Sequence, residues 1–310
     1  MLRVLAVAGW IAGCAAGSAG SAAEVLAIPA VIAFWVLLVF GILAGCVGPV
    51  GAEDAAMTIP VTTADGQRVD LQARLCRPPG EAPARLVVIA HGSPPHEADR
   101  LGMQLSHCTG EVARWFTARG YAVLFTLRRG YGATGGAWAE GYGGCARADY
   151  ARAGLETARD IDATITAGLA MPGIQPNGAV LVGQSAGGWG AIAYGSQRHP
   201  GTAAILVMAG GRGGHHDGVP NRNCRPDRLA EAAGQFGATS RTPMLWIYAE
   251  NDSFFAPEIA AAMHRAFTAA GGRATLLQPG PFDGDGHRLL FGPGGSAVWG
   301  PAVKQFLAQP

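Results

Sequence analysis

The pentapeptide Gly183-Gln184-Ser185-Ala186-Gly187 constrains the fold of this chain more than any other segment. It follows a short apolar run at residues 179–182, which is typical of a buried strand, and it precedes residues 188–194, which can continue as a helix. A strand, a very tight turn and a helix in this order form an elbow that lifts one serine hydroxyl above the edge of a sheet. The two flanking glycines fit this geometry, because Cβ atoms there would collide with the neighbouring strand and helix.

Glycine occupies 47 of the 310 positions, so an ordinary strand-to-helix turn that contains a serine is the alternative interpretation. The rest of the chain favours the elbow, because continuous apolar runs alternate with helix-like segments, as in strands covered on both faces. We predict strands at residues 58–63, 68–76, 86–90, 122–127, 179–182, 203–208, 244–248 and 274–277. Besides the helix after the elbow, we predict helices at residues 111–119, 148–169, 257–270 and 297–307.

This alternation predicts an α/β protein with a mostly parallel, twisted sheet and helices on both of its faces. The dipeptide Asp65-Gly66 is a strong hairpin signal, so the first two strands are expected to form an antiparallel hairpin at the sheet edge. Residues 210–237 are rich in Gly, Arg, Asn and Pro. They are expected to form an insertion over the edge of the sheet where substrate pockets usually lie.

The N-terminal part of the chain differs from the rest in hydropathy. Residues 25–47 are almost entirely apolar and long enough to cross a bilayer as a helix. They are interpreted as an uncleaved anchor, as part of a signal peptide cut after a small residue such as Ala52, or as a lipoprotein signal. In the last case Leu43-Ala44-Gly45-Cys46 resembles the bacterial lipobox. All three interpretations make the protein exported, either membrane-anchored or periplasmic or extracellular.

We therefore divide the chain into a signal or anchor segment (1–46), a linker (47–56) and one folded domain (57–310). Four cysteines follow the N-terminal segment: Cys76, Cys108, Cys145 and Cys224. An even number in an exported domain predicts one or two disulfides, and four cysteines allow three pairings. No C-x-x-C spacing indicates zinc, and a net charge of +1 without clustered Lys and Arg argues against a nucleic-acid partner.

A serine hydroxyl is a weak nucleophile at neutral pH, so it needs a base, and the base needs an orienting partner, usually a carboxylate. Downstream of Ser185, Asp252 follows the strand predicted at residues 244–248, and His287 follows the last predicted strand. Parallel strands bring their carboxyl ends to one edge of a sheet, so we expect these three side chains to meet there. Weaker rivals are Asp217, Asp227, Asp283 and Asp285 for the acid, and His215, His216 and His264 for the base.

Backbone N–H groups must point to the place where negative charge develops on a tetrahedral intermediate. Ala186, directly after the serine, is one predicted donor. The other is expected from the loop His91-Gly92-Ser93-Pro94-Pro95, in which the prolines cannot donate, so Ser93 is the first candidate and Gly92 the second. His91 either braces this loop by hydrogen bonding or is a partly buried structural histidine.

Residues 58–309 resemble the α/β-hydrolase superfamily, above all its branch of dienelactone hydrolases and prolyl-oligopeptidase-type catalytic domains. The matching pieces are His91-Gly92, Arg128-Arg129-Gly130-Tyr131-Gly132, Gly183-Gln184-Ser185-Ala186-Gly187-Gly188, Asn251-Asp252 and Gly286-His287. The resemblance implies the α/β-hydrolase fold and the chain order Ser, Asp, His of its triad. Dienelactone hydrolases use a cysteine nucleophile where this chain has Ser185, and the short apolar segment before the domain is not expected to hold an oligopeptidase propeller.

These patterns predict a serine hydrolase that cleaves a carboxylic ester through an acyl-enzyme, with no metal and no organic cofactor. The alternatives are a peptidase or amidase of the same fold, and a catalytically inactive envelope protein that binds or acts as a scaffold. The expected partners are a small ester or amide substrate and, through the N-terminal segment, a membrane. The sequence predicts no oligomeric state.

Aromatic residues near the predicted site are candidates for the walls of an acyl pocket. Tyr131 and Trp189 are the two predicted pocket residues, with Trp138 and Tyr142 as further candidates, although packing against the sheet is an equally good interpretation of each. Arg128 and Arg129 are expected to form structural salt bridges rather than to bind a substrate carboxylate.

Overall fold

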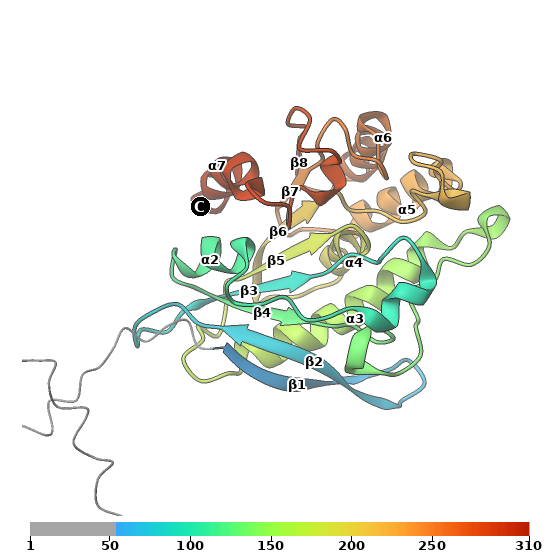
Figure 1. Cartoon of the computed structure of the whole chain (residues 1–310). Helices are drawn as coiled ribbons and strands as arrows, with labels where there is room; N and C mark the ends of the chain where they lie inside the picture. The colour runs from blue at the N-terminus through green and yellow to red at the C-terminus, as the bar shows by residue number, and fades with distance from the viewer. Residues whose placement is uncertain (1–53, 310) are drawn as a thin grey trace, which may run out of the picture. The chain divides into compact units, whose positions relative to one another are not determined.

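The computed structural model describes residues 54–309. They contain an eight-stranded sheet with the order β1-β2-β4-β3-β5-β6-β7-β8. Its strands are β1 (Asp54–Thr62), β2 (Arg68–Cys76), β3 (Arg85–Ala90), β4 (Tyr121–Thr126), β5 (Ala179–Gln184), β6 (Thr202–Met208), β7 (Met244–Ile247) and β8 (Ala274–Leu277). β2 pairs antiparallel with β1 and β4, and all further pairs are parallel. The predicted α/β fold with an antiparallel N-terminal hairpin is confirmed (Figure 1).

Helices cover both faces of the sheet (Figure 1). One face carries α3 (Tyr150–Leu169), α4 (Ala186–Gly195), α5 (Pro226–Thr239) and α6 (Pro257–Ala269), and the other carries α2 (Glu111–Thr117) and α7 (Gly295–Leu307). Side chains of one strand alternate between the two layers: in β3, Val88 belongs to the core of the first layer and Val87 to that of the second. Because both faces are buried, the strands are continuous apolar runs in the sequence.

Helix α5 occupies the second half of residues 210–237, the segment predicted as an insertion over the sheet edge. Pro226 occupies the first turn of this helix, where its missing N–H costs nothing, and the apolar stripe that includes Leu229 and Phe236 is buried. Gly237 lets α5 approach α6, because a Cβ there would lie 2.1 Å from the Phe267 carbonyl oxygen. Only the first part of the predicted insertion, before Pro226, is irregular.

The predicted signal or anchor segment, including the candidate lipobox, lies outside the described residues. Strand β1 begins at Asp54, so the last three residues of the predicted linker pair with β2. Two disulfides, Cys76–Cys108 and Cys145–Cys224, select one of the three possible pairings. Between residues 54 and 309, no helix is both long and apolar enough to span a membrane.

Candidate active site

Ser185 stands at the turn between β5 and α4 in a backbone conformation that few non-glycine residues adopt, with φ 52° and ψ −118°. The turn is possible because its neighbours have no side chain. A Cβ on Gly183 would lie 2.4 Å from the Gly187 carbonyl oxygen, and one on Gly187 would lie 2.2 Å from the Ala90 carbonyl oxygen. The strand, strained turn and helix expected for an elbow are therefore all present.

Asp252 and His287 meet across the loops that follow β7 and β8. The Nδ1 atom of His287 lies 3.0 and 3.1 Å from the two carboxylate oxygens of Asp252. The Asp252 side chain is fully buried, and its Oδ1 also accepts hydrogen bonds from the Phe254 and Phe255 amides at 2.8 and 2.9 Å. Since a carboxylate only accepts, the proton lies on Nδ1 and leaves Nε2 of the imidazole as an acceptor.

His287 also lies next to the elbow. The side-chain amide of Gln184, the residue before Ser185, donates to the His287 carbonyl at 3.2 Å. The Phe254 ring stacks on the His287 imidazole with 4.0 Å between centroids, and Phe254 lines the same cavity as Ser185. Within residues 54–309 the Ser185 hydroxyl makes no hydrogen bond to His287. Such bonds are often long without substrate and shorten in the reactive complex.

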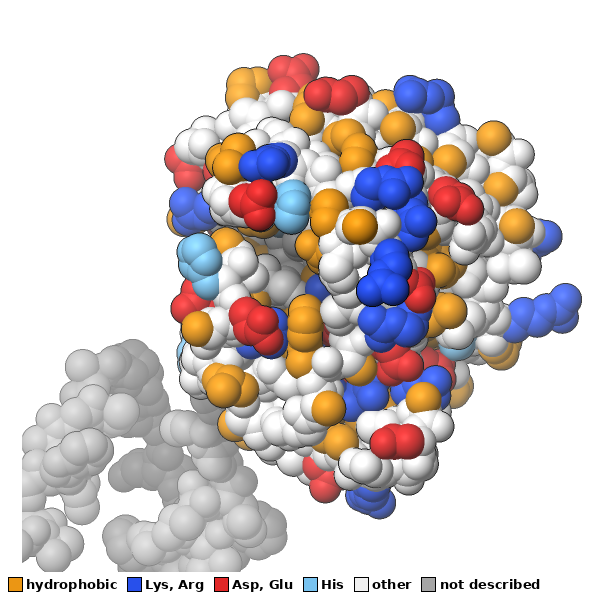
Figure 2. Space-filling view, turned by 90° about the vertical axis from the view of Figure 1, so that its right-hand side faces the viewer, with side chains coloured by type: hydrophobic (Ala, Val, Ile, Leu, Met, Phe, Trp, Pro, Cys, Tyr) orange, Lys and Arg blue, Asp and Glu red, His pale blue; other side chains and the backbone are white. Residues whose placement is uncertain are grey.

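A cavity of about 240 Å³ opens over Ser185 at the carboxyl ends of the parallel strands. Figure 2 views the molecule from the side toward which these strands run and shows a hollow bordered by hydrophobic and charged side chains. The residues around the cavity are Ser93, Pro94, Pro95, Glu97, Arg100, Trp138, Tyr142, Ser185, Ala186, Gly211, Arg212, Gly213, Gly214, His215, Phe254 and Phe255. The cavity wall therefore combines aromatic rings with two arginines.

Both predicted oxyanion donors, Ser93 and Ala186, belong to this cavity wall. Within residues 54–309, neither of their amide N–H groups has a hydrogen-bond acceptor. The loop that carries Ser93 touches the elbow directly, since a Cβ on Gly92 would lie 2.1 Å from the side-chain oxygen of Gln184 and 3.0 Å from Cβ of Ser185. Both amides therefore belong to segments that contact or contain the elbow.

Tyr131 and Trp189, the two predicted pocket residues, do not line the cavity, and this part of the prediction is corrected. Both are fully buried. Trp189 lies on α4 where that helix packs against α3, and its indole N–H donates to the Tyr150 carbonyl at 2.8 Å. Trp138 and Tyr142 border the cavity instead. Sequence patterns could not distinguish cavity residues from packed residues among these four aromatics, because all four lie close to the site along the chain or in space.

Arg128 and Arg129 form the expected structural salt bridges. Arg128 pairs with Glu140, and Arg129 pairs with Asp160 and Glu156. Arg212, a cavity residue that the sequence analysis did not single out, binds the same Glu140 carboxylate. Burial works against ionisation of Glu140, but the guanidinium groups of Arg128 and Arg212 outweigh it and hold its pKa well below the usual range.

His91 braces its loop, as one of its two interpretations predicted. Its Nδ1 donates to the Gly92 carbonyl at 2.6 Å, and its Nε2 accepts from the Arg128 amide at 3.2 Å. The ring also meets the edge of Tyr131, with 4.7 Å between centroids. Burial, followed by repulsion from the Arg128 cation, lowers the pKa of His91 to about 3, so the imidazole is neutral at physiological pH.

The candidates for the acid and the base that the sequence ranked lower have other partners. Asp285 binds the backbone amides of His287 and Ser253, and Asp227 pairs with Arg225. His264 binds the Ala274 carbonyl on the far side of β8. His215 is the one of these histidines at the cavity; its Nε2 lies 2.9 Å from the Ser253 carbonyl oxygen.

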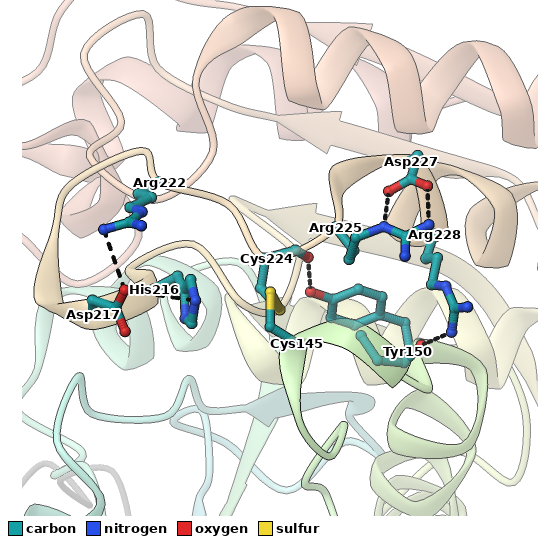
Figure 3. Close-up of a disulfide and its surroundings, with 10 residues drawn as sticks. Cys145, Tyr150, His216, Asp217, Arg222, Cys224, Arg225, Asp227 and Arg228 are labelled. Carbon is teal, nitrogen blue, oxygen red and sulfur yellow. Dashed lines mark hydrogen bonds and ion pairs between the residues drawn. A yellow bond between two sulfur atoms is a disulfide. The ribbon is translucent and has the colours of Figure 1, made fainter.

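The Cys145–Cys224 disulfide joins two of the loops that line the cavity. One loop carries Trp138 and Tyr142, and the other carries Arg212 and His215. Figure 3 shows the disulfide beside Tyr150, whose hydroxyl donates to the Cys224 carbonyl, and next to the ion pairs of Arg222 with Asp217 and of Arg225 with Asp227. The cavity walls are thus covalently linked to each other.

Solved structures with a similar fold come from several hydrolases. A Klebsiella pneumoniae protein assigned as a dienelactone hydrolase matches 83% of this chain and all of its own, with a TM-score of 0.54 and 15% identity. A Pyrococcus furiosus esterase matches 82% of this chain and 92% of its own, with a TM-score of 0.55 and 15% identity. A Pyrococcus horikoshii acylaminoacyl peptidase matches 87% of this chain but only 43% of its own, with a TM-score of 0.57 and 14% identity.

No protein-family model matches the sequence, and neither does any curated protein. At these identities the likeness to solved structures concerns the path of the chain rather than its chemistry. That path agrees in sheet order, helix layers and elbow with the expectation from the sequence. The chain therefore has the fold of the α/β-hydrolase superfamily.

Proposed function

We propose that this protein is a serine hydrolase that cleaves carboxylic esters through an acyl-enzyme intermediate. One observation carries the proposal: a strained elbow presents a serine at a cavity, and the residue before that serine is hydrogen-bonded to a histidine whose Nδ1 is bonded to a buried aspartate. A strained backbone persists only where the surrounding structure enforces it, and such residues cluster at functional sites. The esterase fold likeness supports the same reaction class.

The reaction follows from the roles of the three side chains. Oγ of Ser185 attacks the ester carbonyl carbon while Nε2 of His287 takes its proton, and Asp252 stabilises the imidazolium that forms. The carbonyl oxygen becomes an oxyanion bound by the Ser93 and Ala186 amides. Collapse of this intermediate breaks the ester C–O bond, and His287 returns the proton to the departing alcohol. Water then attacks the acyl-enzyme by the same route and releases the acid and the free serine.

The cavity dimensions favour a small acyl group. Its volume of about 240 Å³ is below the range of about 300–1,000 Å³ that is usual for drug-sized ligands. Trp138, Tyr142 and Phe254 supply apolar surface for such a group. We therefore place short-chain esters ahead of long-chain lipids and peptides as substrates.

We further propose that the protein acts outside the cytoplasm. Its two disulfides are typical of an oxidising compartment. Residues 1–46 then serve as the signal or membrane anchor and 57–310 as the catalytic domain. Detection of a lipid-modified Cys46, of a cleaved N-terminus or of an intact one by mass spectrometry separates the three forms of export signal.

The direct test is labelling with a fluorophosphonate probe together with hydrolysis of p-nitrophenyl acetate. Wild-type protein is expected to be labelled and active, and Ser185→Ala to be unlabelled. His287→Ala is expected to reduce kcat about as much as Ser185→Ala, by about 10⁴-fold or more, because triad members act as a unit. His264→Ala, which removes a histidine remote from the cavity, is the control and should leave kcat unchanged.

Two outcomes would contradict the proposal. A folded wild-type protein that neither reacts with the probe nor turns over any ester would favour the scaffold alternative. Turnover of peptide anilides at rates equal to or above those of esters would favour the peptidase alternative, which the fold of the acylaminoacyl peptidase keeps open.

A further inference from the structure

The loop that carries Ser93 is held from behind by a set of buried polar side chains. From the geometry we infer that Tyr131, anchored by Glu140, is a positioning residue that fixes the Ser93 amide as an oxyanion donor. The inference rests on the proposed function and deepens it, because it concerns the same reaction. Neither residue touches the cavity: Tyr131 is 0% exposed and Glu140 2%. Both therefore act through Ser93 and not on substrate.

A directed chain of hydrogen bonds joins the three residues. The Tyr131 hydroxyl donates to Oε2 of Glu140 at 2.9 Å, so toward Ser93 the same oxygen accepts a hydrogen bond from the serine hydroxyl. The indole N–H of Trp138 also donates to the Tyr131 oxygen, at 3.0 Å. Because the phenol proton is donated to Glu140, the Tyr131 oxygen can only accept in its hydrogen bonds with Ser93 and Trp138.

Two arginines hold the other end of this chain. Arg128 and Arg212 both donate to the Glu140 carboxylate, and Arg212 also reaches Oγ of Ser93 at 3.4 Å. Arg128 in addition donates from Nη1 to the His91 carbonyl at 2.6 Å. The loop is thereby tied on both sides of Gly92, through its backbone at residue 91 and through its side chain at residue 93.

We call this chain of hydrogen bonds from Ser93 through Tyr131 to Glu140 the tether. It matters for catalysis more than for substrate binding. Donors stabilise an oxyanion only when they lie about 2.7–3.1 Å from the place that the charge will occupy, and displacement by about 1 Å can cost 10²-fold in rate. A loop that ends in Pro94-Pro95 has no regular hydrogen-bond ladder to hold it in place. The contact from Ser93 to Tyr131 supplies that restraint, next to the point where Gly92 meets Ser185.

The test is a double-mutant cycle with Tyr131→Phe and Ser93→Ala. Each substitution removes a hydroxyl from the tether without removing a charge, and Ser93→Ala keeps the backbone N–H that binds the oxyanion. We expect each to lower kcat for p-nitrophenyl acetate about tenfold while KM changes less than about twofold. Because both cut the same tether, we expect the double variant to lose no more than the single ones.

Tyr194→Phe is the matched control. Tyr194 is equally buried, and its hydroxyl also makes a buried side-chain hydrogen bond, to Thr202 at 2.7 Å, far from the cavity. We expect this control to lose stability to a similar degree and to keep the wild-type kcat. Thermal unfolding of all variants separates the two effects.

The inference is overturned if Tyr131→Phe retains the kcat of Tyr194→Phe, if the change is confined to KM, or if the two losses multiply in the double variant. A failure of the proposed function is distinct from these results. In that case the wild-type protein itself shows no Ser185-dependent labelling or turnover, and no oxyanion forms for the Ser93 amide to bind.

Discussion

Two carboxylates contact His287 at different places. Asp252 binds its imidazole, whereas Oδ1 of Asp285 accepts from the backbone amides of His287 and Ser253, at 2.9 and 3.0 Å, and Oδ2 from the Ser253 hydroxyl at 2.8 Å. Burial raises the pKa of Asp285, but these hydrogen bonds more than offset it and leave that pKa below the ordinary value. Asp252 thus orients the ring, and Asp285 joins the loops that carry Asp252 and His287.

The substitutions Asp252→Asn and Asp285→Asn are expected to differ sharply in their effect. Asp252→Asn removes the charge that stabilises the imidazolium and permits the wrong tautomer, so kcat should fall by about 10⁴-fold. Asp285→Asn keeps one acceptor for the same backbone amides and should reduce kcat only about tenfold. Steady-state kinetics with p-nitrophenyl acetate measures both. A larger loss for Asp285→Asn would transfer the role of the acid to that residue.

At the scale of elements, the two disulfides join different parts of the domain. Cys76–Cys108 joins the end of β2 to the segment before α2, on the face of the sheet covered by α2 and α7. Cys145–Cys224 instead joins the two loops that form the cavity walls. In the chain-entropy model, loop closure stabilises the native state by at most about 3.7 kcal/mol for the first disulfide and about 4.5 kcal/mol for the second.

We therefore expect removal of the two disulfides, one at a time, to affect stability alone in one case and both stability and activity in the other. Cys76→Ala with Cys108→Ala should lower the midpoint of thermal unfolding and leave kcat near the wild-type value below that midpoint. Cys145→Ala with Cys224→Ala should lower the midpoint too, and should also reduce kcat severalfold, because the wall with Trp138 is no longer linked to the wall with Arg212. Equal kcat values for the two double variants would refute a role of the second disulfide in the cavity.

At the scale of the whole molecule, His91 makes the stability of the domain depend on pH. Its folded-state pKa is lowered to about 3, against the ordinary histidine value of 6.5. Between those values the unfolded chain binds more protons than the native one. The native state is therefore not penalised above about pH 6.5, and it loses stability as pH falls from there toward about 3, by at most about 1.4 kcal/mol per pH unit.

Chemical denaturation at pH 7.5 and pH 5 tests this dependence. His91→Gln keeps an acceptor for the Arg128 amide but cannot titrate, so the free energy of unfolding should fall less for this variant than for wild type over that interval. His96→Gln, at an exposed histidine, controls for the loss of an imidazole. Parallel losses in wild type and His91→Gln would show that His91 is not the group responsible.

Several features of this molecule could be predicted from local sequence alone. The strands appear as continuous apolar runs because both faces of the sheet are buried, and the glycines around Ser185 appear because no Cβ fits there. Asp252 and His287 could be selected because each lies in the loop after a strand, and parallel strands end at one edge. These are consequences of short-range geometry, so a short window of sequence contains them.

Other features depended on contacts between segments that are distant along the chain. No helix was predicted at α5, where Gly237 is explained only by the packing of α6 against it, and the cysteine pairing was open until the folded chain brought Cys145 to Cys224. Glu140 carried no sequence signal, because its partner Arg128 is 12 residues away along the same loop and its partner Arg212 comes from a different loop. The sequence by itself determined the sheet, the elbow and the order of the triad. Only the tertiary structure decided the pocket walls and the tether behind Ser93, since burial and charge pairing there arise from residues that no local pattern connects.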